Sequence, residues 1–266
     1  MDGDHSVTSG SVDFVEVLGL PERARETHRL TKKDIVEQWE HTAPADARLL
    51  RRAISSARIV GVLSPATTGV PAVRDADRPV DMIPVLEVRI AGDVTAKDER
   101  RAAELLHRAI PRPAVITLSS PEGGPVLSLA LTRLSKTDVG RSVVEEHLTV
   151  PIDGIAAASI HVGELDRTDL GSLYRDVVRR AAADGHPAPS LRDAAEAVEL
   201  RHRLVGLDED LQSAMRSATR EKSMQRRIEH NGEARDLRDR IAQTRHALYG
   251  EPSVRTRTSE DPKLGP

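Results

Sequence analysis

Two carboxylates and an arginine near the middle of the chain are the sequence's closest approach to a hydrolytic site. Five residues separate Asp81 from Glu87, and Arg89 follows Glu87 by two positions. Two carboxylates at a strand end are able to hold a divalent cation that activates water. Arg89, however, stays protonated at every relevant pH and is a poor proton acceptor. Glu87 and Arg89 also alternate on one face of an expected strand, where an exposed ion pair is the simpler interpretation. A divergent metal-dependent nuclease is therefore an alternative hypothesis rather than the main one.

A loop rich in small residues and hydroxyls follows the first expected strand of the middle region. Its sequence, SPATTGVP, covers residues 64–71. The hydroxyls of Thr67 and Thr68 and the backbone amide of Gly69 are groups that could bind an anion. A loop made rigid by its two prolines, with no ligand, explains the same residues. The sequence leaves both interpretations open.

Basic residues near the C-terminus give the strongest indication of a binding surface. Arg216 lies beside a set of polar side chains that are candidates for contacts with nucleic acid or a protein partner: Arg220, Lys222, Arg226, Arg227 and Asn231. Contacts to phosphate need little more than local positive charge. Glutamates interrupt this stretch and no aromatic residues are interspersed, so a solvated helix face or a protein-docking surface is favoured over DNA. Lys32 and Lys33, at the start of an expected helix, are a weaker candidate pair for the same kinds of contact.

Metal and cofactor sites are not predicted. The ten histidines fall in no H-x3-H or H-E-x-x-H pattern, and the absence of cysteine excludes thiolate ligands. His107 belongs to an amphipathic helix, where packing or capping is its expected role. No serine stands in a G-x-S-x-G turn, and the glycine patterns of dinucleotide-binding and P-loop folds are missing.

The elements that must position these residues follow from periodicity and turn chemistry. Helices are expected over residues 12–19, 31–39, 44–57, 96–110 and 169–185, and strands over 57–63, 82–90, 114–120, 126–134, 142–150 and 157–162. The middle therefore reads β-α-β-β, which predicts an α+β fold with a mixed or antiparallel sheet and flanking helices.

The chain from residue 191 to about 249 is expected to be helical. Leu200, Leu204 and Leu207 begin one heptad-spaced series, and Ala234, Leu237 and others form a second. Residues 191–210 carry three arginines and six acidic residues, whereas residues 216–245 carry nine basic and five acidic residues. Opposite charge favours an antiparallel helical hairpin or coiled coil, and one long projecting helix is the alternative. Gly206 and Gly232 are positions where a bend is possible, although neither glycine forces one.

These patterns predict four segments. They are a flexible leader, an α+β domain, a helical arm and a disordered tail, over residues 1–10, 11–188, 189–250 and 251–266. The net charge of −3 gives no global attraction to nucleic acid, and no apolar run is long enough to span a membrane. The N-terminus lacks the features of a signal peptide. A cytoplasmic protein is expected.

Five phrases resemble one bacterial family. They are RLTKKDIVEQ, GVLSPATTGVP, LLHRAIPRPAVI, GSLYRDVV and REKSMQRRIEHN, in that order. Together they resemble the uncharacterised family known as domain of unknown function 4391, over roughly residues 14–249. Members are often encoded beside helicase and DNA methyltransferase genes of phage-defence islands. The resemblance thus implies an accessory component of a DNA-handling assembly.

The main prediction is a non-catalytic accessory subunit without cofactors that docks through its C-terminal helical arm. Its expected partner is a helicase- or methyltransferase-type protein, with a second copy of the chain or DNA as further candidates. The alternatives are a nucleic-acid-binding module that uses the basic cluster, and the metal-dependent nuclease.

Overall fold

The computed structural model describes residues 14–40, 42–121, 123–138, 140–153, 155, 157–186 and 193–250. The predicted leader, tail and most of the linker before the arm lie outside these residues. Within the described part, the chain up to Glu199 forms one compact unit, here called the body, and the chain from Leu200 onward forms a second, here called the hairpin. The two units are described separately.

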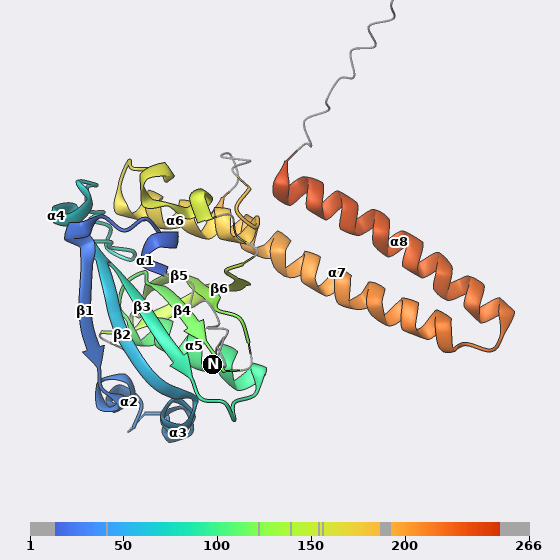
Figure 1. Cartoon of the computed structure of the whole chain (residues 1–266), viewed down its shortest axis with the longest axis horizontal. Coiled ribbons are helices and arrows are strands. Elements are labelled where there is room, and N and C mark those ends of the chain that lie inside the picture. The colour runs from blue at the N-terminus through green and yellow to red at the C-terminus, as the bar shows by residue number, and fades with distance from the viewer. Residues whose placement is uncertain are drawn as a thin grey trace, which may run out of the picture. The chain divides into compact units, whose positions relative to one another are not determined.

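The body is built on a six-stranded mixed sheet (Figure 1). Its strands, in sheet order, are β1 (Arg25–Leu30), β2 (Ile54–Leu63), β3 (Ile83–Ile90), β4 (Val115–Ser119), β5 (Val126–Leu134) and β6 (Ser142–Pro151). β3 and β4 are parallel, and every other neighbouring pair is antiparallel. The predicted α+β fold with a mixed sheet is confirmed.

The helices of the body include four that have nine or more residues and cover the sheet. The helical elements are α1 (Phe14–Val17), η1 (Glu22–Ala24), α2 (Lys32–Glu40), α3 (Pro44–Ala53), α4 (Pro65–Thr68), α5 (Ala96–Ala109), η2 (Ala157–Ile160), η3 (Val162–Glu164) and α6 (Leu170–Ala182). Helix α5 makes the crossover that the parallel β3–β4 pair requires. Its side-chain cap is Thr95, whose hydroxyl accepts a hydrogen bond from the Asp98 amide.

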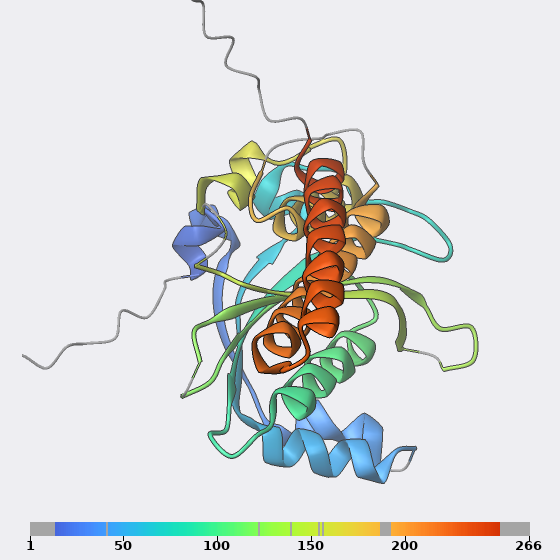
Figure 2. The ribbon, with the colours of Figure 1, turned by 90° about the vertical axis from the view of Figure 1, so that its right-hand side faces the viewer.

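One face of the sheet packs against α2, α3 and α5, which Figure 2 shows grouped together. Trp39, Leu50 and Leu105 come from these helices and are 0–2% exposed. They meet the core-facing residues of β2, β3 and β4, such as Leu86 and Val88. Alternation along the strands supplies this apolar face, so the core follows from the period-two pattern.

The other face is covered by α6 over β5 and β6. The Tyr174 hydroxyl donates within the sheet interior to the backbone oxygens of Ala114 and Ala130, 3.0 Å from each, and accepts from the Ala130 amide. Asp176, 6% exposed, is paired with Arg179 and Arg180 on the same helix. Arg180 also donates to backbone oxygens of the η2–η3 segment, which fixes that segment to α6.

Three details of the expected secondary structure were wrong. Residues 54–57 were expected to end the helix that starts at Pro44, but α3 ends at Ala53, and the chain from Ile54 pairs with β3 as part of β2. The strand β1 was not predicted, because it is an edge strand with the sequence RETHRL and has no buried alternation to reveal it. Residues 157–162 were expected to be a strand but form the 3-10 turns η2 and η3. Their apolar residues Ile160 and Val162 are buried without joining the sheet.

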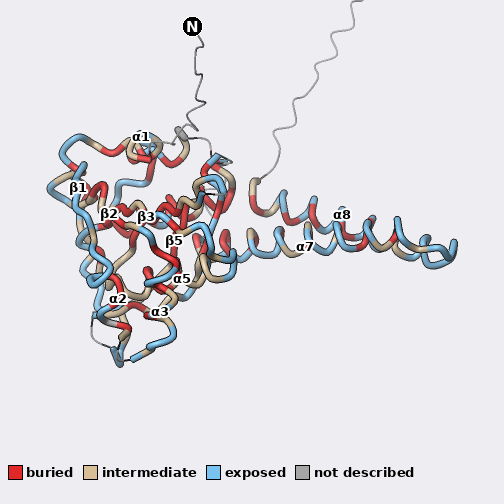
Figure 3. The backbone as a smooth tube through the Cα atoms, turned by 60° about the horizontal axis from the view of Figure 1, so that its bottom comes forward, coloured by how far each residue is buried: buried red, intermediate tan, exposed pale blue. Residues whose placement is uncertain are grey.

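The second unit is a helical hairpin, as predicted. It consists of α7 (Ala194–Arg220), whose first six residues belong to the body, and α8 (Met224–Tyr249). Contacts between the helices are antiparallel: Arg245 pairs with Asp208 at 3.7 Å, and Arg201 donates to the Tyr249 hydroxyl at 3.4 Å. The chain reverses at residues 221–223 rather than at either glycine. The buried residues repeat at heptad spacing: Leu204, Leu207, Ala214 and Ala218 on α7, and Ala234, Leu237, Ile241, Thr244 and Leu248 on α8. We call this series the seam; Figure 3 shows its buried positions alternating with exposed ones. None of the described helices is long and apolar enough to cross a bilayer.

Candidate functional site

The tip of the hairpin, residues 220–231, contains the predicted binding cluster. Glu221 closes the turn by accepting a hydrogen bond from the Ser223 amide at 2.9 Å, and this bond lowers the pKa of the Glu221 carboxyl. The Ser223 carbonyl then accepts from the Arg227 amide, which starts α8. The reversal therefore depends on a local carboxylate rather than on a glycine.

Two apolar side chains at the tip are left out of the seam. Met224 is 67% exposed and Ile228 is 55% exposed, the two largest values among the exposed large apolar residues. Four residues apart on α8, they lie on one face of the helix in successive turns. The described end of the hairpin gives them no apolar cover, so they are available for contact with another molecule.

The predicted contact residues are close to this apolar pair in sequence. All five are exposed: Arg220, Lys222, Arg226, Arg227 and Asn231. At 100° per residue, Arg227 and Asn231 flank the Met224–Ile228 face of α8, whereas Arg226 lies on the opposite side of the helix. Lys32 and Lys33 belong to the body instead, where Lys32 donates to the Arg51 carbonyl and Lys33 lies 3.9 Å from Glu37.

The two carboxylates of the nuclease hypothesis do not come together. Asp81 lies before β3 and pairs with Arg112 at 3.0 Å, whereas Glu87 is inside β3 and pairs with Arg58. Six extended residues span about 20 Å, which is far beyond the reach of one cation. In the described residues, no group of three or more histidine, aspartate or glutamate side chains is arranged to hold a metal ion.

The hydroxyls of the predicted ligand loop are used within the protein. Residues 65–68 form the short helix α4, and the Ser64 and Thr67 side chains cap it reciprocally. Thr67 donates to the Val62 carbonyl at 2.8 Å, and Thr68 donates to the Ser64 carbonyl at 2.7 Å. The Gly69 amide is bonded to the Pro65 carbonyl, and Gly69 has the left-handed φ of 73° that ends the turn. This geometry favours the rigid-loop interpretation over an anion site.

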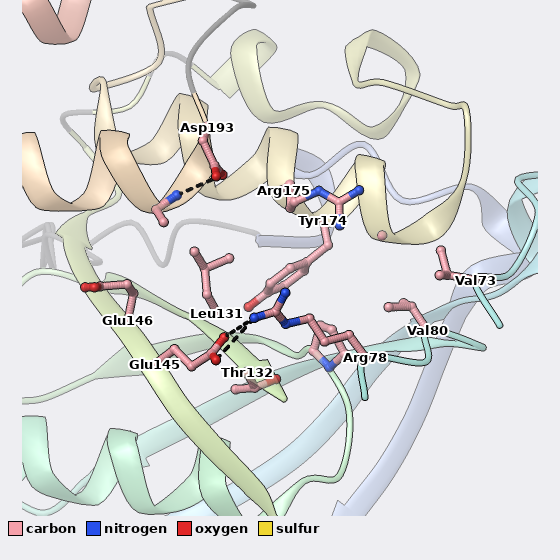
Figure 4. A pocket seen from close by; sticks show the side chains of 13 residues that line it. Val73, Arg78, Val80, Leu131, Thr132, Glu145, Glu146, Tyr174, Arg175 and Asp193 are labelled. Carbon is pink, nitrogen blue, oxygen red and sulfur yellow. Dashed lines mark hydrogen bonds and ion pairs between the residues drawn. The ribbon is translucent and has the colours of Figure 1, made fainter. Parts of the chain in front are cut away.

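A pocket of about 390 Å³ opens in the body between β5, β6, α6 and the segment that contains Val73 and Val80 (Figure 4). Its volume is within the range of small-molecule sites. Arg78 crosses it to form a two-oxygen contact with Glu145, at 2.9 and 3.2 Å. Arg175 projects from α6 beside it.

The described side chains of the pocket are suited to binding a small molecule, but they offer no evident proton-transfer group. Burial raises the pKa of the Tyr174 hydroxyl, and three backbone hydrogen bonds already occupy that group. Sequence reasoning missed the pocket because Arg78 and Glu145 are 67 positions apart. Only the GSLYRDVV phrase, which places Tyr174 and Arg175 on one helix, pointed toward it.

A second unpredicted polar group is buried between α5 and the sheet. His107 Nε2 is 3.0 Å from the Ser128 hydroxyl oxygen, which is 2.9 Å from His147 Nε2. Burial lowers the pKa of His107 to about 3, and the neighbouring His147 contributes to the shift. His107 Nδ1 has no partner among the described residues, so we assign the ring proton to Nε2, which donates to Ser128. The expected packing role of His107 agrees with this position, and Ser128, 0% exposed, is no accessible nucleophile.

Comparison with known proteins decides the family. The model of the family described as "Domain of unknown function (DUF4391)" matches residues 18–241. The chain belongs to this family. Searches of curated proteins and of solved structures give no match. In this DUF4391 protein, two of the phrases that carry the resemblance meet at the hydrogen bond between Tyr174 and the Ala114 carbonyl.

Proposed function

We propose that this DUF4391 protein is a non-catalytic interaction subunit of a bacterial DNA-handling assembly, acting in the cytoplasm. It docks on a protein partner through the tip of its helical hairpin. The observation that carries the proposal is the exposure of Met224 and Ile228 outside the seam that holds the hairpin together. Apolar side chains that do not stabilise their own fold are typical of contact sites for other proteins.

The charge around the apolar pair defines the complementary surface. Arg227 flanks the pair on α8, and Lys222 is exposed in the turn that precedes it, so we expect the partner to offer an apolar patch with carboxylates at its margin. From the genes expected beside those of family members, that partner is a helicase- or methyltransferase-type protein of a phage-defence cluster. Rim charges mainly set the rate and specificity of such docking, whereas the apolar centre sets its lifetime.

The test is a pull-down of the tagged full chain from its own host, with mass spectrometry of the proteins that co-purify. The tip variant Met224→Ser/Ile228→Ser is compared with Val205→Ser, which changes an exposed apolar residue elsewhere on the hairpin. We expect a stoichiometric helicase- or methyltransferase-type partner with the wild type and with Val205→Ser, and its loss with the tip variant. Purification of the wild-type chain alone, or an equal yield of partner with the tip variant, overturns the proposal.

The exposed cations at the tip favour nucleic-acid binding as a second candidate function. If the tip binds DNA, affinity falls steeply with salt, and Arg226→Glu/Arg227→Glu abolishes binding. If the tip binds only protein, the same variant leaves DNA binding unchanged and slows association with the partner.

A further inference from the structure

Three arginines on adjacent strands of the body share the face of the sheet that lies opposite the α2–α3–α5 core. Arg29 of β1 is opposite Arg58 of β2, Arg58 is opposite Glu87 of β3, and Ser56 is opposite Arg89. Residues directly opposite each other point to the same side of a sheet. Their neighbours Ala57 and Val88 belong to the core cluster, so alternation places these polar residues on the other side. We call this surface the arginine face.

The arginine face is hollowed and open. A cavity of about 310 Å³ is lined by Thr27, Arg29, Ser56, Ala57, Arg58, Glu87 and Arg89. The side chains of Arg58 and Arg89 are 50% and 66% exposed, and every residue of β1 up to Arg29 is exposed. Three neighbouring strands span about 10 Å, which is wide enough for several oxygen atoms of an extended ligand.

One carboxylate organises the arginine face without neutralising it. Glu87 Oε2 accepts from Arg58 Nε at 3.0 Å and from Arg58 Nη2 at 2.5 Å, while Glu87 Oε1 lies 3.9 Å from Arg89 Nε. The Arg29 guanidinium has no hydrogen-bond or ion-pair partner among the described residues. Three arginines against one glutamate leave an excess of two positive charges.

This arrangement is unfavourable for the protein alone. Directly opposed like charges such as Arg29 and Arg58 destabilise a sheet, and Glu87 offsets only part of that repulsion. An anion between the strands would relieve it. Guanidinium groups stay charged and present forked donors that match phosphate oxygens, and the hydroxyls of Thr27 and Ser56 add donors at the margin of the cavity.

We propose that the arginine face binds the phosphate groups of a nucleic-acid strand without reading its base sequence. The cavity lining contains no aromatic ring on which a base could stack, so the recognised chemistry is the phosphate ester itself. A nucleotide offers the same chemistry as a strand, but the spread of the arginines over three strands of the sheet favours consecutive phosphates. This site is separate from the hairpin tip.

The test measures binding of fluorescent single-stranded and duplex oligonucleotides to the full-length protein by anisotropy over a range of salt concentrations. The site variant Arg29→Ala/Arg89→Ala is compared with Arg48→Ala/Arg100→Ala, which removes two exposed helix arginines and the same net charge. We expect the site variant to weaken binding by about tenfold or more and to lower the salt slope by about 2, one for each lost phosphate contact. The control variant is expected to bind like the wild type.

Two further comparisons make the test specific. Glu87→Gln keeps an acceptor for Arg58 but removes negative charge, so binding should tighten severalfold, and weaker binding counts against the proposal. Arg226→Glu/Arg227→Glu should retain the binding that depends on Arg29 and Arg89. Equal affinities of the site and control variants overturn the proposal. It also fails if thymidine monophosphate or inorganic phosphate binds in an Arg29-dependent manner while the strands do not.

Discussion

The body and the hairpin use their apolar residues in different ways. In the body, most large apolar side chains on both sheet faces are buried, and Trp39, Leu50 and Leu105 are close to fully enclosed. In the hairpin, the two helices are joined along the seam, which is made of leucine, isoleucine, alanine and threonine side chains, and several large apolar residues lie outside it. Four of the five exposed large hydrophobic residues in the described chain belong to this unit: Val205, Met215, Met224 and Ile228.

The difference indicates where each unit meets other molecules. Among the five exposed large apolar residues, the body has only Met82, and its arginine face is open and positively charged. The hairpin has apolar surface that its own folding does not require. An anionic ligand is therefore expected at the arginine face of the body, and a protein at the hairpin.

The largest loss of stability is expected from a substitution in the core of the body, where the apolar side chains are most completely buried. Leu105→Ala removes a fully buried side chain of α5 and should lower the free energy of unfolding by about 3 kcal/mol. Trp39 is the only tryptophan and lies in the same core cluster, so its fluorescence during urea unfolding reports on this unit.

The matched control for this substitution is Val205→Ala, which truncates an exposed side chain on α7. It should change the same free energy by less than about 0.5 kcal/mol. A loss of under about 1 kcal/mol in Leu105→Ala would contradict the assignment of α5 to the core.

A loss of stability of intermediate size is expected when the pH is lowered, because of a buried histidine in the body. The folded-state pKa of His107 is lowered to about 3, from 6.5 in the unfolded chain. Between these values the unfolded state binds one more proton, so this contribution to stability is complete above pH 6.5 and is lost as pH falls toward 3. The loss is about 1.4 kcal/mol per pH unit, or about 2 kcal/mol at pH 5.

Urea unfolding at several pH values, followed by Trp39 fluorescence, measures this slope. Other groups also titrate in the range, so the informative quantity is the difference between the wild type and His107→Gln. The variant should be less dependent on pH between 6.5 and 4. An identical slope in the two proteins would show that His107 is not buried in its neutral form.

The sequence predicted the elements that are marked by apolar runs or by apolar residues at helical spacing. The strands β3 and β5 are rich in valine, leucine and isoleucine, and helix α5 and the seam have apolar residues three or four positions apart. The edge strand β1 has no such apolar pattern, because neither of its faces is enclosed by the protein. At the hairpin reversal, Glu221 accepts a hydrogen bond from the Ser223 amide, and no sequence repeat predicts such a local contact.

Some residues of the candidate sites were also predictable from the sequence, whereas others were not. The sequence singled out the basic residues of the tip, but it did not predict Met224 and Ile228 as contact residues, because their exposure outside the seam is visible only in the structure. The Arg78–Glu145 contact and the row of Arg29, Arg58 and Glu87 arise from pairing between distant strands. Such neighbours are fixed by sheet register, which residue spacing along one strand does not reveal.

Among the proposed substitutions of buried residues, the smallest loss of stability is expected in the seam of the hairpin. Leu237→Ala removes a side chain that is 5% exposed but has only one partner helix to pack against. We expect a loss of about 2 kcal/mol or less, at the low end for buried leucines, because two helices are able to close around the gap more easily than a layered core. Far-UV circular dichroism should show earlier loss of helix in urea, while the Trp39 transition stays at the wild-type midpoint. If the Trp39 midpoint shifts by the same amount, the two units unfold together, and the hairpin stabilises the body as well as presenting a surface to a partner.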